Sequence, residues 1–472
     1  MGRRDARHGS RLAFWLPVVL VLALLAGAGT TYWLDRDQPD PDTDPEQVAP
    51  PAGLELPPLT APAPVAAAAA GTADPVKVRR ALAPLLADPD LGPHVLAAVA
   101  GLDGTPVFTR GGGEVVPAST LKLLTSTAAL ETMGPDHTFA TTVVTTGPRR
   151  IVLVGGGDPL LSATRPARDA YPRPADVVTL ARATATELLA GGTSRVRLGY
   201  DATLFTGPDV SPHWPESYIP DAVVAPIQSL WVDEGRPVDG DRDERVADPA
   251  LAAANAFADA LTRAGVRVVG APTPRPADPA ATEVARVTSP PLSQLVEHTL
   301  LVSDNEAAEV LARQVAVTTG VPATFAGGAG AVLKVVTGLG VPTSGATTYD
   351  GSGLSRDNRL DPTLLTALLH VVGSEEHPDL RPVLTGLPVA GFNGSLSERF
   401  TETVDRAGRG SVRAKTGTLT GVSGLAGTVT DRTGTPMVFA VMADHIALAD
   451  TLDARAALDA VASALAACRC AA

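Results

Sequence analysis

Lysine is scarce in this chain. Its 472 residues contain 38 lysines and arginines together, and only four of them are lysines: Lys77, Lys122, Lys334 and Lys415. Arginine therefore supplies the positive charge wherever any cation suffices. Arginine stays protonated at working pH, whereas a desolvated lysine can release its proton. We therefore expect a proton-transfer role at some of these four positions.

Patterns typical of disulfide scaffolds, metal sites and nucleic-acid binding are also lacking. The two cysteines, Cys468 and Cys470, lie one residue apart near the end of the chain and form neither a disulfide framework nor a zinc site. The eight histidines show no ligand spacing such as H-x-x-x-H, so we predict no metal and no cofactor. A net charge of −13 argues against a nucleic-acid partner.

Only one long apolar run is present, which excludes a multi-pass membrane protein. Residues 12–34 carry no charge and follow four arginines within residues 1–11, a pattern typical of an export signal. The run is long enough to cross a bilayer, so residues 1–34 are either cleaved after Ala28 or kept as a membrane anchor. We favour the anchor over cleavage, and both over a buried helix. Residues 35–75 are rich in Pro, Asp and Ala and predict a disordered spacer.

The segment Pro117-Ala-Ser-Thr-Leu-Lys-Leu-Leu-Thr125 holds Ser119 and Lys122 as an S-x-x-K pair at the start of an apolar helical run. Residues three apart share a helix face, so the Lys122 amine is expected beside the Ser119 hydroxyl. A serine becomes a nucleophile when a base takes its proton, and a lysine with a lowered pKa can be that base. A simple helix N-cap is the commoner role of a lone serine at such a position.

Two further motifs follow in the chain, each in one copy. Ser303-Asp-Asn305 is an S-D-N, and Lys415-Thr-Gly417 is a K-T-G that continues into Thr418. Each also has a structural interpretation: Ser303 and Glu306 fit a capping box for a helix over 306–315, and the K-T-G fits a strand followed by a turn. Short motifs are weak evidence singly, but three in this order favour one joint catalytic site.

Apolar periodicity predicts a mixed fold in which terminal and central helices pack on an antiparallel sheet. The expected helices are a short one near Val76, one that begins at Ser119, and others over 176–190, 249–264, a stretch from 292, 306–315 and 447–467. The expected strands cover 94–102, 105–110, 139–154 as a pair, 196–198, 266–269, 413–418, 423–430 and 436–443, with a further strand near Leu204.

On these motifs the chain resembles the low-molecular-mass class C penicillin-binding proteins, the D-alanyl-D-alanine carboxypeptidase/endopeptidase family. The resemblance runs from about residue 76 to 467. It rests on five segments, which are residues 117–125, 153–161, 303–306, 350–356 and 412–419.

The resemblance implies an α+β fold of the penicillin-recognising serine transpeptidase/β-lactamase type. Its catalytic domain would be split into residues 76–138 and 287–472, because the interval between Ser119 and Ser303 is far longer than in class A β-lactamases. Residues 139–286 would form an inserted, smaller α/β domain. Residues 159–175 are too short for the second insert of larger family members, so we predict that it is absent or reduced.

The resemblance also implies the chemistry. Ser119 would attack the carbonyl of a D-Ala-D-Ala stem peptide of peptidoglycan, with Lys122 as the base, and form an acyl-enzyme. Ser303 would relay a proton to the leaving amine, and Asn305 would hold the substrate amide and Lys122. A β-lactam would acylate Ser119 by the same route.

The K-T-G strand would bind the other end of the substrate. Lys415, Thr416, Gly417 and Thr418 are expected around the terminal carboxylate, and the charge of Lys415 would help to keep Lys122 neutral. The enzyme would act outside the cytoplasm, anchored in the cell membrane or secreted to the cell wall. The alternatives are a β-lactamase or related serine esterase, and an inactive, tethered scaffold with the same fold.

Overall fold

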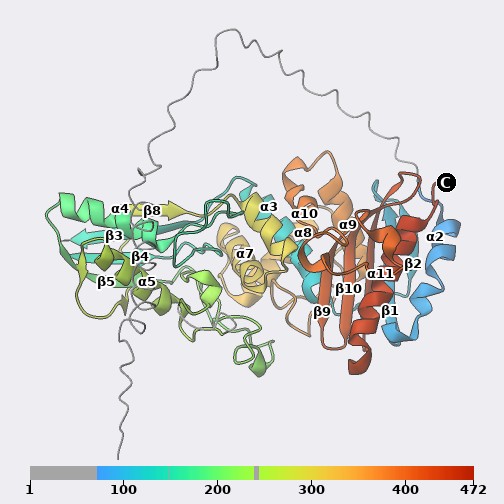
Figure 1. Cartoon of the computed structure of the whole chain (residues 1–472), viewed down its shortest axis with the longest axis horizontal. Helices are drawn as coiled ribbons and strands as arrows, with labels where there is room; N and C mark the ends of the chain where they lie inside the picture. The colour runs from blue at the N-terminus through green and yellow to red at the C-terminus, as the bar shows by residue number, and fades with distance from the viewer. Residues whose placement is uncertain (1–71, 148, 239–243) are drawn as a thin grey trace, which may run out of the picture. The chain divides into compact units, whose positions relative to one another are not determined.

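The computed structural model describes residues 72–147, 149–238 and 244–472 (Figure 1). The predicted signal or anchor, 1–34, and almost all of the predicted spacer, 35–75, lie outside these ranges. The last residues of that spacer are folded, because Ala73 forms a bridge with Ala471 and helix α2 begins at Pro75. Among the described helices, none combines the length and the apolarity that a membrane crossing requires.

An antiparallel sheet of five strands carries the K-T-G motif. Its order is β2-β1-β11-β10-β9, so β9 is an edge strand. The bounds are β1 His94–Gly101, β2 Pro106–Arg110, β9 Val412–Leu419, β10 Val422–Thr430 and β11 Pro436–Asp444. These strands agree with the sequence prediction to within one or two residues; β1 and β11 are short, continuous apolar runs, as expected of strands that are buried on both faces.

The two faces of this sheet pack against different helices. On β10, Leu425 belongs to the core shared with α2 (Pro75–Leu82) and α11 (Thr451–Ala467), whereas Ala426 belongs to the core shared with α3 (Lys122–Met133) and α9 (Pro362–Gly373). Successive side chains of a strand point to opposite faces, which explains this division. In Figure 1, α11 runs alongside β10 at the C-terminal, red end of the colour scale.

Helix α3 is central to the helical part of the molecule. It contacts α6 (Leu292–Leu301), α7 (Asn305–Thr318) and α8 (Phe325–Gly338), and α10 (Pro382–Thr385) lies nearby. Its residues from Lys122 to Leu130 are all buried. The S-x-x-K pair is therefore held by a helix that is covered on all sides.

A second sheet is formed between residues 140 and 288. Its order is β6-β5-β4-β3-β8, with β7 also paired to β5. The bounds are β3 Ala140–Gly147, β4 Arg150–Val154, β5 Arg195–Asp201, β6 Arg267–Val268, β7 Thr273–Pro274 and β8 Thr282–Thr288, with helices α4 Val177–Ala190 and α5 Pro249–Arg263. A separate hydrophobic cluster joins this sheet to α4 and α5. The division into two domains at residues 139 and 286 stays a prediction.

Some local features differ from the sequence prediction. Leu204 lies in a turn rather than a strand, and helices α8 and α9 were not predicted. Residues 159–175 contain turns and bends with one bridge, between Ser162 and Asp176. Cys468 and Cys470 form a disulfide with each other, a local link at the end of α11 rather than a framework.

Candidate active site

Ser119 lies in a 3-10 turn, Ala118–Leu121, that leads directly into α3. The helix predicted to begin at this serine is therefore present, with its first turn tightened. Ala118 is fully buried and has a φ of 45°, a conformation that a residue with a Cβ rarely adopts. Such local strain persists only where the surroundings hold the backbone in place, and it is frequent at active sites. The turn thus fixes the direction of the Ser119 side chain.

The Lys122 amine lies at the centre of a compact set of polar groups. Its Nζ is 2.8 Å from Ser119 Oγ, 2.7 Å from Asn305 Oδ1 and 2.9 Å from the backbone oxygen of Ser352. The side chain of Lys122 is fully buried. The structure therefore brings three of the predicted site residues together around one amine.

Burial makes this amine easier to deprotonate. It lowers the pKa of Lys122 from 10.5 to about 8, although the carboxylates of Asp304 and Glu309 act in the opposite direction. When Lys122 is neutral, its two N–H groups can donate to Asn305 and Ser352. Its lone pair can then accept the hydroxyl proton of Ser119, as a general base requires.

Lys415 is the second fully buried lysine of the site. Its Nζ donates to Ser303 Oγ at 2.8 Å and to the backbone oxygen of Thr416 at 2.9 Å. Burial lowers the pKa of Lys415 well below its ordinary value, and the charge of Lys122 lowers it further. Burial is the larger cause of the lowered pKa of Lys415 and the cause of the lowered pKa of Lys122; the influence of the Lys415 charge on Lys122 stays a prediction.

Ser303 occupies the turn between α6 and α7 with a φ of 63°. The capping box predicted for Ser303 and Glu306 is wrong. Asp304 is the N-cap of α7, and its Oδ1 accepts the backbone N–H of Ala307 at 2.9 Å. The left-handed turn places Ser303 one position before the cap, which frees its hydroxyl for Lys415.

The K-T-G glycine allows β9 to lie directly against the Ser119 turn. A Cβ on Gly417 would come within 2.7 Å of the backbone oxygen of Pro117. Only a residue without a side chain permits this approach. Thr416 Oγ1 and Ser395 Oγ are hydrogen-bonded at 2.9 Å. Thr418 is exposed on the same strand.

The loop 350–356 was noted in the sequence only for its resemblance, yet it forms one wall of the Lys122 site. Its Ser352 carbonyl accepts from Lys122, and Glu309 on α7 holds the loop by accepting the backbone N–H groups of Gly351 and Ser352. Burial and the charge of Asp350 raise the pKa of Glu309 to about 7. No local motif marks Glu309, because its partners lie more than forty positions away in the chain.

Asp350 organises the same loop from within. Its carboxylate accepts the backbone N–H groups of Gly353 and Ser355 and the side-chain donors of Trp214 and Asn358. Gly353 is required here, because a Cβ at this position would lie 1.9 Å from the backbone oxygen of Ala118. The loop therefore fits closely behind the nucleophile turn.

Comparison with known proteins identifies the family of the chain. The chain matches the D-Ala-D-Ala carboxypeptidase 3 (S13) family over residues 78–239 and 241–465. It is 36% identical to carboxypeptidase DacB of Mycolicibacterium smegmatis over 98% of both chains. It is 31% identical to a D-alanyl-D-alanine carboxypeptidase of an Actinomadura strain, over 75% of this chain and 78% of that protein.

The fold agrees with these matches. The crystal structure of penicillin binding protein 4 from Haemophilus influenzae superimposes with a TM-score of 0.66 at 20% identity, covering 82% of this chain and 97% of that one. The family resemblance, the α+β fold and the serine carboxypeptidase class predicted from the sequence are confirmed. The chain belongs to the D-Ala-D-Ala carboxypeptidase 3 (S13) family.

Proposed function

We propose that Ser119 is the nucleophile and Lys122 the general base of a D-alanyl-D-alanine carboxypeptidase acting on peptidoglycan stem peptides. In this reaction Ser119 Oγ bonds to the carbonyl carbon between the two D-alanines, and its proton passes to Lys122. The distance of 2.8 Å between Lys122 Nζ and Ser119 Oγ, at a fully buried amine, is the observation that carries the proposal.

The tetrahedral oxyanion requires donors that are already in position. We assign this role to the backbone N–H groups of Ser119 and Thr418. The close approach of β9 to the Ser119 turn, which Gly417 permits, supports the assignment. The first amides of a helical segment are free of helical partners, which makes Ser119 a suitable donor.

Collapse of the intermediate breaks the bond to the terminal D-alanine, whose nitrogen must gain a proton. Ser303 is assigned as the relay for that proton, supported by its hydrogen bond with Lys415. Asn305 is assigned to hold Lys122 and the substrate amide. Water then adds to the acyl carbon and releases the shortened peptide, which restores the Ser119 hydroxyl.

The free carboxylate of the substrate is assigned to the K-T-G strand. Lys415 offers a positive charge, Thr416 and Thr418 offer hydroxyls, and Gly417 allows the strand to approach. Because β9 is an edge strand, an extended peptide can lie along it.

Release of D-alanine tests this assignment directly. We expect the full-length chain to release D-alanine from a stem peptide ending in D-Ala-D-Ala, and Ser119→Ala to release none. The same peptide with a C-terminal amide lacks the charge that Lys415 would bind, so its kcat/KM should fall by about 10-fold or more, the value of a lost charged hydrogen bond. Equal rates on the acid and the amide would rule out the carboxylate role.

The family acts on the cell wall, so we propose an extracytoplasmic enzyme that residues 1–34 attach to the cell membrane. The basic start and the uncharged run over 12–34 support the anchor. Intact mass of the protein extracted from cells tests it. A mass that includes residue 1 in the membrane fraction is expected, and a soluble chain beginning near residue 29 would overturn the anchor.

A further inference from the structure

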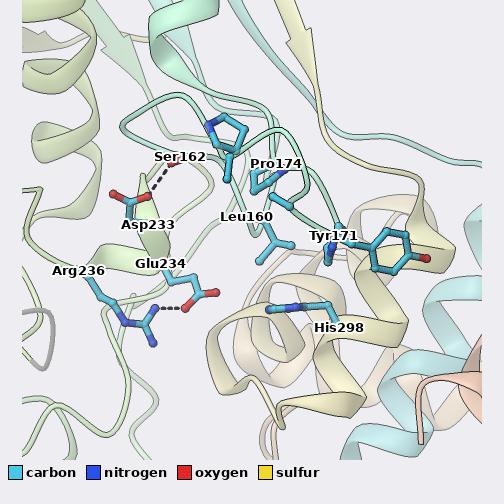
Figure 2. A pocket seen from close by; sticks show the side chains of 12 residues that line it. Leu160, Ser162, Tyr171, Pro174, Asp233, Glu234, Arg236 and His298 are labelled. Carbon is cyan, nitrogen blue, oxygen red and sulfur yellow. Dashed lines mark hydrogen bonds and ion pairs between the residues drawn. The ribbon is translucent and has the colours of Figure 1, made fainter. Parts of the chain in front are cut away.

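A pocket of about 460 Å³ lies between the 160–174 segment, residues 233–236 and α6. Figure 2 shows the side chains that line it. His298 of α6 and Glu234 both line the pocket, and neither was singled out by the sequence motifs. The proposed catalytic residues Ser119 and Lys122 do not line it.

Three potential metal ligands converge at this pocket. One carboxylate oxygen of Glu234, one of Asp304 and a ring nitrogen of His298 all lie within 4.8 Å of one another. The Nε2 atom of His298 is 3.7 Å from Asp304 Oδ2. Two ligands of one zinc ion, each about 2.0–2.2 Å from the metal, are separated by a similar distance in a tetrahedral site.

Asp304 supplies the second, independent observation. The residue is only 8% exposed, and as the N-cap of α7 it accepts the backbone N–H of Ala307 through Oδ1. Its Oδ2 is buried and has no hydrogen-bond partner among the described residues. A buried carboxylate oxygen without a donor is costly. A cation placed between Asp304 and His298 would remove that cost.

Glu234 completes the set from the opposite wall. Its carboxylate is ion-paired with Arg236 through Oε2, which holds the side chain in place. In Figure 2 this carboxylate lies between Arg236 and the ring of His298, with its other oxygen directed toward the pocket. Arg236 therefore orients Glu234 much as an outer-shell partner orients a metal ligand.

We propose that Glu234, His298 and Asp304 bind a divalent transition-metal ion, with zinc as the best fit. One imidazole nitrogen and two carboxylate oxygens suit zinc, and three protein ligands leave a fourth position open to the pocket. The spacing of residues 234, 298 and 304 along the chain explains why the sequence predicted no metal. The fold, not a local motif, assembles this set.

A bound ion would also act on the neighbouring active site. Asp304 lies between Ser303, which contacts Lys415, and Asn305, which contacts Lys122. With Oδ1 bound to the backbone N–H of Ala307 and Oδ2 bound to the ion, the Asp304 side chain would keep the S-D-N turn in one conformation. We therefore expect zinc to raise the melting temperature of the protein, since it binds the folded state and has no preformed site in the unfolded chain.

Calorimetric titration with Zn²⁺ tests the proposal on the untagged full-length chain, purified in detergent and stripped of metal with a chelator. The wild type should bind one ion, and Co²⁺ in its place should give a visible absorption spectrum with a nitrogen–oxygen ligand set. Glu234→Gln and His298→Asn should each weaken binding by at least about 10–100-fold, the loss that even an outer-shell substitution causes.

Asp233→Asn is the matched control. Asp233 lines the same pocket, but its carboxylate accepts a hydrogen bond from the Ser162 hydroxyl and is not one of the three proposed ligands. It should keep the zinc affinity of the wild type. Circular dichroism of each variant verifies its fold. Absence of zinc binding by the wild type would overturn the proposal, and so would binding that survives both ligand substitutions or is lost equally in Asp233→Asn.

Discussion

The four lysines of this chain fall into two classes by environment. Lys122 and Lys415 are fully buried, and the amine of each is hydrogen-bonded to a serine hydroxyl, whereas Lys77 and Lys334 are exposed. Burial lowers the pKa of both lysines of the first class, a change that arginine would resist, whereas the exposed lysines lack that environment. Two of the four lysines that the sequence analysis singled out are therefore the two that the structure buries; their catalytic roles stay proposals.

Replacing Lys122 by arginine tests the base assignment at constant charge. Lys122→Arg should lower the rate of acylation by a β-lactam by about 10²–10⁴-fold, the usual contribution of a general base. Stopped-flow or quenched acylation by penicillin measures it. Lys334→Arg, an exposed lysine on α8, is the matched control and should acylate at the wild-type rate. Acylation by Lys122→Arg at that rate would refute the role of Lys122.

The lowered pKa of Lys122 predicts a pH dependence of acylation. Below a pKa of about 8 the amine is protonated and cannot accept the proton of Ser119; above it the amine is neutral. The second-order acylation rate should therefore rise by about 10-fold per pH unit below pH 8 and level off above it. A penicillin assay from pH 6 to 9.5, corrected for hydrolysis in buffer, measures this. A rate that is flat or falls across this range would contradict a lysine base.

At the scale of elements, the site depends on how closely β9 and the loop 350–356 approach the Ser119 turn. Glycine is required at both contacts, because a Cβ on Gly417 or Gly353 would collide with backbone oxygens of Pro117 or Ala118. These contacts join segments that are hundreds of residues apart in the chain, so their geometry comes from the sheet and the helices behind them.

Gly417→Ala should separate β9 from the nucleophile turn while the fold persists. Its Cβ would lie 2.7 Å from the Pro117 oxygen, and a misplacement of about 1 Å in a catalytic site can cost about 100-fold in rate. The penicillin acylation rate measures the effect.

Gly330→Ala is the control for this substitution. Gly330 is exposed in the middle of α8, and among the described residues no atom lies within 4 Å of the site of a Cβ. Alanine there should leave acylation unchanged and raise the free energy of unfolding by about 0.5–1 kcal/mol, measured by urea denaturation. Equal acylation rates for the two variants would show that close packing at Gly417 is not needed.

Local signals in the sequence found the elements that they describe directly. Short apolar runs marked β1 and β11, and the three motifs marked Ser119, Ser303 and Lys415. Contacts between distant segments left no such signal. Glu309 was missed because it binds backbone amides of a loop more than forty positions away. Asp350 was noted only within the segment 350–356, because the donors that it binds come together only in the folded loop and with Trp214. The N-cap of α7 was assigned to Ser303 instead of Asp304, because residue types do not show that Ser303 has a φ of 63°.

At the scale of the whole molecule, two sheets with separate hydrophobic clusters flank the central helix α3 and its neighbours. The S-x-x-K, S-D-N and K-T-G motifs come from α3, the α6–α7 turn and an edge strand, and long intervals separate them in the chain. Family membership and the match to a solved structure agree with the fold that brings these segments together. All three motifs are proposed to serve one acylating serine, Ser119.

Intact-mass spectrometry after incubation with a penicillin tests that claim most directly. The full-length wild type should gain the mass of one penicillin, and Ser119→Ala, verified as folded by circular dichroism, should gain none. Penicillin that is recovered hydrolysed without an adduct would favour a β-lactamase. An adduct that persists in Ser119→Ala, or unreacted penicillin with folded wild type, would contradict the assignment of Ser119.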